Sequence, residues 1–279
     1  MILSRLIRQT IDKLRPSIGD YATATTERML MHELGCSRAE LYLSAERLID
    51  TAGLNRIDAI VERCQKHEPI EYVLGETYFF DREFMVTPAV LLPRPDTELL
   101  VETVLRNEIK ESLLFADIGT GSGIISCILT EKQPQWRGVG IDISASALGV
   151  ALRNSKTGRI QLVCSDLFSG IGPSIKFDLI VSNPPYIPTH EIRNLDESVR
   201  CFEPLCALDG GADGLDFYRR IATEAPHRLK ATAALYCEIG FDQEAAVREI
   251  FSTAPWDDIH CYHDLAGHPR VISARIRRH

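Results

Sequence analysis

The stretch Leu113-Leu-Phe-Ala-Asp-Ile-Gly-Thr-Gly-Ser-Gly-Ile124 joins an apolar run to a glycine-rich turn. Residues 113–117 have the character of a buried strand, and residues 123–132 are expected to form a helix. The turn therefore connects a strand directly to a helix. Glycines at such a turn let the backbone bend sharply and let a ligand approach it closely. This stretch predicts an α/β fold with a ligand site at the end of a strand.

The same alternation continues along the chain. A helix is expected at 97–107, capped by Asp96, and is followed by strands and helices at 138–143, 145–154, 160–165 and 177–182. Toward the C-terminus we expect helices at 215–229 and 243–251 and strands at 233–239, 259–262 and 270–276. Alternating strands and helices predict a parallel sheet with helices on both faces. No helix separates the last two strands, so they are expected to pair antiparallel.

Residues 1–68 differ from the rest, because their apolar positions recur at helical spacing and strand signals are few. Ser37 and Glu40 have the spacing of a capping box, and Asn55 is a candidate cap for a later helix. Residues 78–86 alternate as in a short hairpin. The sequence thus predicts three parts, which are a helical domain at 1–68, a hairpin linker at 69–90 and an α/β domain at 91–279.

Composition places the chain among soluble globular proteins. Its 279 residues are 45% hydrophobic and 25% charged, which excludes intrinsic disorder and collagen-like repeats. No apolar run approaches the roughly 18 residues of a membrane span and no export signal is visible, so we expect a cytoplasmic protein without membrane contact. The net charge of −8 argues against stable nucleic-acid binding through phosphates. Eight irregularly spaced cysteines indicate reduced thiols rather than a disulfide framework.

The glycine-rich turn Asp117-Ile-Gly-Thr-Gly-Ser-Gly123 is the first candidate binding site. A dinucleotide fingerprint would need a glycine at position 124, where the chain has Ile, so the pyrophosphate interpretation is weakened. Asp117 would repel a diphosphate but can accept a hydrogen bond from the ammonium group of an amino-acid ligand. These features favour S-adenosylmethionine, and a tight turn without any ligand is the alternative.

Two further acids follow the next two strands. Asp142 lies at the end of the second strand, where an acid can accept both hydroxyls of a ribose. Asp166 follows the third strand and could accept from an adenine amino group while Leu167 packs on the ring. A purely structural capping role for Asp166 is equally open. The acids therefore predict a nucleoside without identifying it.

Asn183-Pro184-Pro185-Tyr186 follows the strand at 177–182 and is the most specific motif in the chain. Its position predicts the carboxyl edge of the sheet, and its prolines stiffen the backbone. The Asn183 side-chain oxygen and the Pro184 carbonyl can accept both hydrogens of a planar NH2 group, while Tyr186 stacks on its face. Two acceptors concentrate charge on this poorly nucleophilic nitrogen as it attacks a sulfonium methyl in line. We expect Asn183, Pro184 and Tyr186 to be catalytic without a metal; a rigid turn is the alternative.

The tetrapeptide resembles the signature of methyltransferases that act on planar amino groups, which include DNA adenine and protein glutamine enzymes. Glu71-Tyr-Val-Leu-Gly75 and Val90-Leu-Leu-Pro-Arg-Pro-Asp-Thr-Glu98 are similar to the segment before the core of release factor glutamine methyltransferases, the PrmC/HemK family. Arg200-Cys-Phe-Glu-Pro-Leu-Cys-Ala-Leu208 resembles the same family's stretch after the tetrapeptide. The resemblance covers nearly the whole chain and is looser before about residue 67. Leu265 departs from it, because a tyrosine is expected there.

The resemblance implies a Rossmann-like class I S-adenosylmethionine-dependent methyltransferase with a helical N-terminal domain that docks class 1 peptide chain release factors. The reaction it implies is methylation of the side-chain amide nitrogen (N5) of the glutamine in the Gly-Gly-Gln motif, leaving S-adenosylhomocysteine. The cofactor would be held by Asp117, Ile118, Gly119, Thr120, Gly121, Asp142, Asp166, Leu167 and Asn183. The glutamine would be held by Asn183, Pro184, Pro185, Tyr186 and Phe84, beside the turn at 93–98.

Other interpretations stay open beside this one. The tetrapeptide also suits an adenine N6 methyltransferase acting on nucleic acid or an enzyme for another protein glutamine, and the glycine-rich turn alone suits a non-catalytic binding protein. Nothing in the sequence requires a dimer, so a monomer is expected. His260 and His263 could suggest a metal, yet strand alternation would send His260 and Tyr262 to one face and Cys261 and His263 to the other. No metal site is therefore expected.

Overall fold

The computed structural model describes residues 1–253 and 255–277. The contacts within the chain divide it into two units. Unit 1 comprises residues 1–76 and 196–202, and unit 2 comprises residues 77–195 and 203–279. Residues 278 and 279, which end the α/β domain expected from the sequence, lie outside the described residues. The first division, between residues 76 and 77, falls within the segment 69–90 that the sequence marks as a connection, whereas the segment 196–202 of unit 1 comes from the expected α/β domain.

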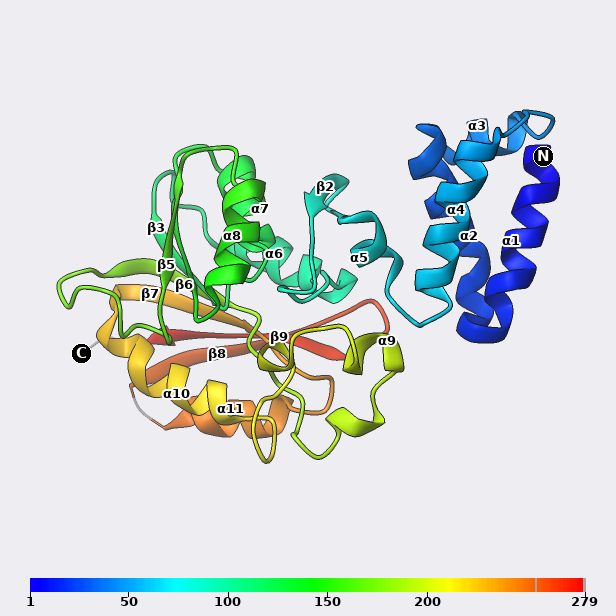
Figure 1. The fold of residues 1–279 in the computed structure, drawn as a ribbon. Coiled ribbons are helices and arrows are strands. Elements are labelled where there is room, and N and C mark those ends of the chain that lie inside the picture. The colour runs from blue at the N-terminus through cyan, green and yellow to red at the C-terminus, as the bar shows by residue number, and fades with distance from the viewer. Residues whose placement is uncertain (254, 278–279) are drawn as a thin grey trace. The chain divides into compact units, whose positions relative to one another are not determined.

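Unit 1 is helical, as the sequence predicts. Its helices are α1 (Leu3–Ile18), α2 (Ala22–Leu34), α3 (Arg38–Leu43), α4 (Thr51–Cys64), α5 (Ile70–Leu74) and the short α9 (Glu197–Arg200) (Figure 1). The apolar faces of α1 to α4 meet in one core that includes Leu14, Met29, Leu41 and Ile57, all essentially inaccessible to solvent. Burial of these faces is what stabilises helices of this length.

The ends of the helices in unit 1 test two expectations about capping. The capping box of Ser37 and Glu40 is present, with each side chain bonded to the other residue's backbone N–H. The expectation that Asn55 caps a helix is wrong. Helix α4 begins at Thr51, because the Asp50 carboxylate accepts a hydrogen bond from the Gly53 N–H at 2.8 Å. Asn55 lies inside that helix.

Unit 2 is built on a seven-stranded sheet in the order β5-β4-β3-β6-β7-β9-β8 (Figure 1). The strands are β3 (Leu114–Ile118), β4 (Arg137–Asp142), β5 (Ile160–Cys164), β6 (Phe177–Ser182), β7 (Leu229–Glu238), β8 (Trp256–His263) and β9 (Pro269–Ile276). The first five in this order are parallel, and β9 runs antiparallel to both of its neighbours. The mostly parallel sheet and the antiparallel final hairpin are thus confirmed. A separate hairpin forms from β1 (Glu76–Phe79) and β2 (Arg82–Met85), as expected.

Helices cover both faces of the large sheet. Helices α6 (Pro95–Asn107), α7 (Ile124–Lys132) and α8 (Ala145–Asn154) lie on one face, and α10 (Asp216–Glu224) and α11 (Glu244–Ser252) on the other (Figure 1). Successive residues of the central strands alternate between the two cores, so Leu179 packs under α6 and α7 while Ile180 packs under α10 and α11. Strands buried on both faces explain the nearly continuous apolar runs in the sequence.

Several element boundaries differ from the sequence prediction, and three of them have a local reason. Asp96 does not cap α6, because the helix begins at Pro95, whose fixed φ suits the first helical position. The helix expected to reach 229 ends at Glu224, and the 3-10 turn Ala225–His227 contains a proline. Strand β7 begins earlier than expected, with an irregular register against β6 and a positive φ of 67° at Thr232. The other 3-10 turns are Gly19–Tyr21, Ile192–Asn194 and Leu205–Ala207.

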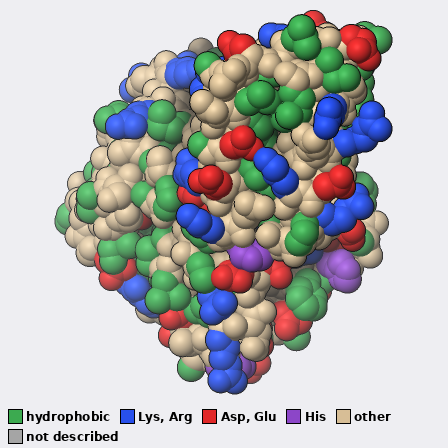
Figure 2. Space-filling view, turned by 45° about the vertical axis from the view of Figure 1, so that its right-hand side comes forward, with side chains coloured by type: hydrophobic (Ala, Val, Ile, Leu, Met, Phe, Trp, Pro, Cys, Tyr) green, Lys and Arg blue, Asp and Glu red, His purple; other side chains and the backbone are tan. Residues whose placement is uncertain are grey.

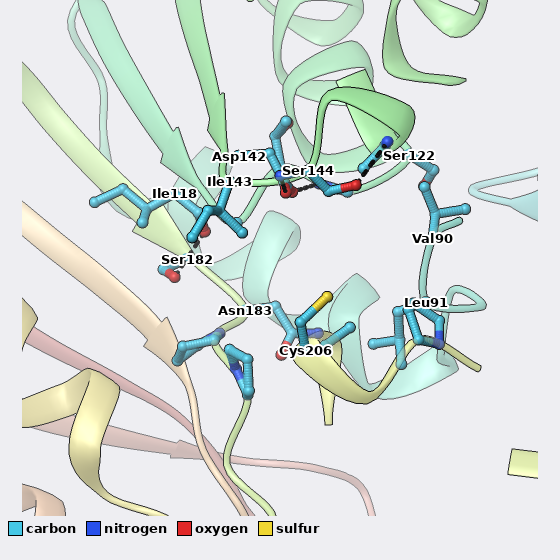
Figure 3. A pocket seen from close by; sticks show the side chains of 18 of the residues that line it. Val90, Leu91, Ile118, Ser122, Asp142, Ile143, Ser144, Ser182, Asn183 and Cys206 are labelled. Atoms are coloured by element: carbon cyan, nitrogen blue, oxygen red, sulfur yellow. Dashed lines mark hydrogen bonds between the residues drawn. The ribbon is translucent and has the colours of Figure 1, made fainter. Parts of the chain in front are cut away.

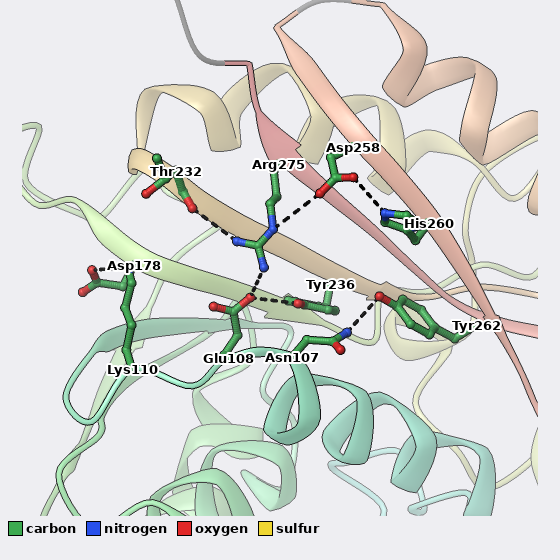
Figure 4. A network of polar contacts seen from close by, with 10 residues as sticks. All are labelled: Asn107, Glu108, Lys110, Asp178, Thr232, Tyr236, Asp258, His260, Tyr262 and Arg275. Carbon is green, nitrogen blue, oxygen red and sulfur yellow. Dashed lines mark hydrogen bonds and ion pairs between the residues drawn. The ribbon is translucent and has the colours of Figure 1, made fainter.

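A polar network ties the end of α6 to the middle of the sheet (Figure 4). Glu108 is 5% exposed and accepts hydrogen bonds from the Tyr236 hydroxyl at 2.8 Å and from Arg275 Nη2 at 2.6 Å. Arg275 also donates to the Thr232 carbonyl. Because a buried carboxylate is costly without partners, this network fixes α6 against β7 and β9. Among the described residues, no helix combines the length and apolar character needed to cross a membrane.

Replacing Arg275 by Met is expected to lower the free energy of unfolding by about 2 kcal/mol, because Glu108 stays buried with one neutral partner. This loss of unfolding free energy is smaller than that expected for a fully buried ion pair, since the Arg275 side chain is 34% exposed. Lys110→Met is the matched control; its ion pair with Asp178 is more exposed and Lys230 also neutralises Asp178, so a change below about 0.5 kcal/mol is expected. Urea unfolding of the two variants measures the difference, and equal losses would contradict the assignment.

Candidate active site

A cavity of about 620 Å³ opens at the carboxyl ends of the parallel strands (Figure 3). It lies at the end of β3, whose two neighbours in the sheet are β4 and β6. The strand order reverses between these two neighbours, and open α/β sheets bind ligands at such a reversal point. Its volume is in the range of small-molecule sites. The walls come from the segments 89–94, 118–125, 141–147, 165–167, 182–185 and 204–209, with Thr97, Phe217 and Arg220.

The glycine-rich turn forms the wall of this cavity above β3. Gly119 and Gly121 have φ angles of 68° and 54°, which side chains with a Cβ rarely adopt. The N–H groups of Gly119 and Thr120 both donate to the Ile141 carbonyl, at 2.8 and 3.0 Å, and so fasten the turn to β4. Ile118, Gly119, Thr120 and Gly121 all line the cavity. The turn thus presents backbone rather than side chains to a ligand.

Asp117 lies beneath this turn and is completely buried. Its Oδ2 accepts hydrogen bonds from the Thr120 hydroxyl at 2.7 Å and from the Ser126 hydroxyl and N–H, while Oδ1 has no hydrogen-bond partner among the described residues. Burial raises the pKa of Asp117 to about 6, against the opposing effect of these hydrogen bonds. The carboxyl group therefore supports the turn from below and keeps one acceptor oxygen unused. Asp117 itself is absent from the cavity wall.

Asp142 ends β4 and faces the cavity (Figure 3). Its Oδ2 accepts from the Gly121 N–H at 2.9 Å and its Oδ1 from the Ser144 N–H at 2.8 Å. Two backbone donors hold the carboxylate in one orientation, and each oxygen keeps a second lone pair. Asp142 can therefore accept two hydroxyl groups, as the sequence prediction of a ribose requires.

Leu167 and Asp166 follow β5 and both line the cavity. Leu167 is 4% exposed and adopts a positive φ of 45°, an uncommon conformation that turns this apolar side chain into the wall. The Asp166 carboxylate is half exposed and pairs with Arg220 Nη2 at 2.8 Å. The Asp166 carboxylate, which we expect to contact the adenine, is therefore also paired with Arg220. The sequence did not indicate this ion pair.

The Asn183-Pro184-Pro185-Tyr186 motif follows β6 directly. The Ser182 hydroxyl donates to the Ile118 carbonyl at 2.8 Å, which fixes the end of β6 against β3. Asn183, Pro184 and Pro185 line the cavity. Tyr186 is half-buried, and its hydroxyl lies 3.5 Å from the carboxylate of Glu238. Burial and the Glu238 charge raise the pKa of Tyr186 above its usual value, so the ring stays neutral.

Phe84 is absent from the cavity wall, as are Asp117 and Tyr186. It is 1% exposed and lies in the core with Phe79, their ring centres 6.4 Å apart. The Arg82 guanidinium covers its ring at 4.4 Å. Alternation along β2 turns Phe84 inward, so the expectation that it walls the substrate pocket gives way to a packing role.

Two buried polar residues at the site were missed from the sequence. Glu203 is 6% exposed, pairs with Arg94 and accepts from the Leu92 N–H at 3.2 Å, which fixes the wall segment 89–94. Glu238 is 1% exposed at the end of β7 and accepts from the Thr97 hydroxyl at 2.7 Å. Both acids sit in otherwise apolar contexts, and only the three-dimensional pairing gives them a role.

A group of potential metal ligands lies away from this cavity. Among the described residues, Glu244, Cys261 and His263 place their ligand atoms within 4.8 Å of one another. Cys261 and His263 share a face of β8, as alternation predicts, and Glu244 on α11, which the sequence did not indicate, lies beside them. Arg248 already pairs with Glu244 at 3.1 Å, which opposes binding of a cation.

The residues present fit S-adenosylmethionine. Asp117 supports the turn expected at the amino-acid end from beneath, with an Oδ1 that has no hydrogen-bond partner among the described residues, and Asp142 has free lone pairs for a ribose. Leu167 offers an apolar wall for a flat base. Together with the strand order, this cavity defines a class I S-adenosylmethionine-dependent methyltransferase, and the first three residues of the tetrapeptide line it.

Comparison with known proteins narrows the class. The Methyltransferase small domain model matches residues 95–198, and the PrmC N-terminal domain model matches residues 5–75. The release factor glutamine methyltransferase of Geobacter sulfurreducens is 39% identical over 97% of this chain and 96% of its own, and that of Koribacter versatilis is 38% identical over 90% of each chain. A methyltransferase from Pyrococcus furiosus shares the fold, with a TM-score of 0.54 at 15% identity over 82% of this chain and 99% of its own. This chain belongs to the release factor glutamine methyltransferase family.

Proposed function

We propose that the protein transfers a methyl group from S-adenosylmethionine to the side-chain amide nitrogen of the glutamine in the Gly-Gly-Gln motif of class 1 peptide chain release factors. The observation that carries this proposal is that Asn183, Pro184 and Pro185 of the Asn-Pro-Pro-Tyr motif line a nucleoside-sized cavity, in a chain 39% identical to a named release factor glutamine methyltransferase. Methylation at that glutamine would modulate translation termination.

The chain's own residues would prepare the amide nitrogen for attack. The bound cofactor supplies a methyl group on a positively charged sulfur. Asn183 Oδ1 and the Pro184 carbonyl would accept the two amide hydrogens, and Tyr186, which stays neutral, would pack on the amide plane. Acceptors on both N–H bonds polarise these bonds toward nitrogen and stabilise the positive charge that develops there as the N–C bond forms and the S–C bond breaks. The methylated nitrogen would then lose a proton to water. The stiff proline backbone would hold these acceptors in place without reorganisation.

The cofactor contacts form a second part of the proposal. We assign the amino-acid end of S-adenosylmethionine to the turn Ile118, Gly119, Thr120 and Gly121 above Asp117, and the ribose to Asp142. Leu167 and Asp166 would contact the adenine, with Asn183 near the methyl group. This assignment follows the spatial order of the strands, β5-β4-β3-β6, whose carboxyl ends carry the adenine, ribose, amino-acid and substrate contacts in turn.

We further assign release factor docking to the helical residues 1–68, with residues 69–90 as the connection and 91–279 as the methyltransferase domain. We expect a cytoplasmic monomer that makes no stable contact with nucleic acid. The net charge of −8 supports the last point, and on the face drawn in Figure 2 acidic and basic side chains are interspersed rather than gathered into a basic patch.

The proposal is tested by incubating the protein and labelled S-adenosylmethionine with a purified class 1 release factor. We expect label on this release factor and none on a matched version whose Gly-Gly-Gln glutamine is changed to alanine. Duplex DNA in a parallel reaction tests the amino-methyltransferase alternative and should stay unlabelled at any salt concentration. Label on the alanine version, or on DNA alone, would reject the proposed substrate.

A further inference from the structure

A chain of hydrogen bonds leads from the tetrapeptide into the buried interior of unit 2. Asn183 Nδ2 donates to the Thr97 hydroxyl oxygen at 3.1 Å, and that hydroxyl donates to Glu238 Oε2 at 2.7 Å. Thr97 is 2% exposed in the first turn of α6, and Glu238 is 1% exposed at the end of β7. Three elements distant in sequence thus converge on one amide side chain.

The direction of these bonds decides which end of the Asn183 amide faces the cavity. A threonine hydroxyl has a single proton, and an ionised carboxylate can only accept. Glu238 therefore accepts the proton of the Thr97 hydroxyl group, and the lone pairs of the Thr97 hydroxyl oxygen face Asn183. Of the two ends of the amide, only Nδ2 can donate to those lone pairs, so the acceptor Oδ1 is left for the substrate.

We propose that Thr97 and Glu238 are positioning residues that hold the Asn183 amide in the one orientation in which Oδ1 can accept a hydrogen from the substrate nitrogen. This inference rests on the proposed function, because it concerns how that reaction's acceptor is oriented. Neither residue needs to touch the substrate. Without them the amide could rotate by half a turn, because its two ends have nearly the same shape. The Nδ2 donor would then face the substrate N–H, which is also a donor.

The charges around Glu238 make this orientation sensitive to pH. Asp96 on α6, Arg270 on β9 and Tyr186 after β6 face its side chain, and Tyr218 on α10 donates to its backbone carbonyl at 2.8 Å. Burial raises the pKa of Glu238 to about 7, with Asp96 adding to the shift and Thr97 and Arg270 opposing it. A protonated Glu238 could donate to Thr97, which reverses the chain of hydrogen bonds. Methyl transfer should therefore weaken as the pH falls below about 7.

The first test compares Thr97→Val with Thr97→Ser. Valine has the shape of threonine but can neither donate nor accept, so we expect kcat to fall about 30-fold to 100-fold, while KM for the release factor and Kd for S-adenosylhomocysteine change less than about 3-fold. Serine keeps the hydroxyl and should retain most of the activity. A purely structural Thr97 would change the melting temperature without this split between the two variants.

The second test is the pH profile of Glu238→Gln. Glutamine can accept the Thr97 proton through Oε1 but does not titrate, so the acidic limb of kcat near pH 7 seen in the parent protein should disappear. Because burial raises the pKa of Glu238 from its usual 4.5, folding binds a proton, and this stabilisation is lost as the pH rises toward 7. The variant should accordingly melt at a higher temperature than the parent above pH 7.

The outcomes separate this inference from the function on which it rests. An inactive parent protein on release factors would reject the proposed function itself. If the parent protein is active, three results would each reject the positioning role alone. These are full activity of Thr97→Val, a loss in Thr97→Ser as large as that in Thr97→Val, and an unchanged acidic limb of kcat in Glu238→Gln. Circular dichroism of each variant at the assay temperature verifies that the compared proteins are folded.

Discussion

Asn183→Ala is expected to lower kcat for methyl transfer by about 10²-fold to 10³-fold, the cost of removing one pre-aligned polar group from a transition state. The alanine variant loses the acceptor that would hold one hydrogen of the substrate nitrogen. The ends of β3 and β6 stay joined through Ser182 and Ile118, so the cavity keeps its shape. Affinity for S-adenosylhomocysteine, measured by calorimetry, should change less than about 3-fold.

Asn183→Asp serves as the matched variant for this prediction. The aspartate has nearly the same size and keeps an acceptor oxygen, but it cannot donate to Thr97 as the Asn183 amide does. We expect its kcat to lie between those of the parent protein and the alanine variant. A parallel loss of cofactor affinity and kcat in Asn183→Ala would instead show that Asn183 acts only by holding the cofactor and not by orienting the substrate nitrogen.

Asp142→Ala is expected to weaken binding of S-adenosylmethionine by about 10²-fold, with much less effect on KM for the release factor. The side chain is the proposed acceptor for the ribose and also anchors the backbone N–H groups of Gly121 and Ser144. Its loss therefore removes a ligand contact and loosens two wall segments together. Isothermal titration with the cofactor measures the effect directly.

Asp166→Ala is the comparison for Asp142→Ala. The Asp166 carboxylate is half exposed and paired with Arg220, so water and the arginine already compete for it. We expect its replacement to weaken cofactor binding by no more than about 5-fold. Equal losses in the two variants would show that the acids contribute alike, contrary to the different environments that the structure gives them.

The sequence predicted the parts of the fold that depend on local chemistry. Apolar runs predict strands such as β6 (Phe177–Ser182), and the glycine-rich turn is explained by the positive φ angles of Gly119 and Gly121. The position of Asn183 at the carboxyl edge followed from its place after a buried strand. These features need no knowledge of distant partners.

What the sequence could not predict depends on long-range pairing. Thr97 and Glu238 are 141 positions apart, and neither stretch signals that their side chains meet. Phe84 shows the same dependence on long-range packing. The family resemblance placed it on the wall of the substrate pocket, whereas its ring lies in the core beneath β2. The prediction for Asn55 failed for a local reason, since Asp50 is an equally good cap and the apolar pattern already begins at Leu54, before Asn55.

The most direct test of the central claim is to locate the methyl group on the product by fragmentation mass spectrometry. The peptide that carries Gly-Gly-Gln is isolated from a release factor after reaction with the parent protein, and in parallel after reaction with Asn183→Ala. We expect a single methyl group on the side-chain nitrogen of that glutamine with the parent protein, and almost none with the variant. A methyl group on any other atom or residue, or equal methylation by both proteins, would contradict it.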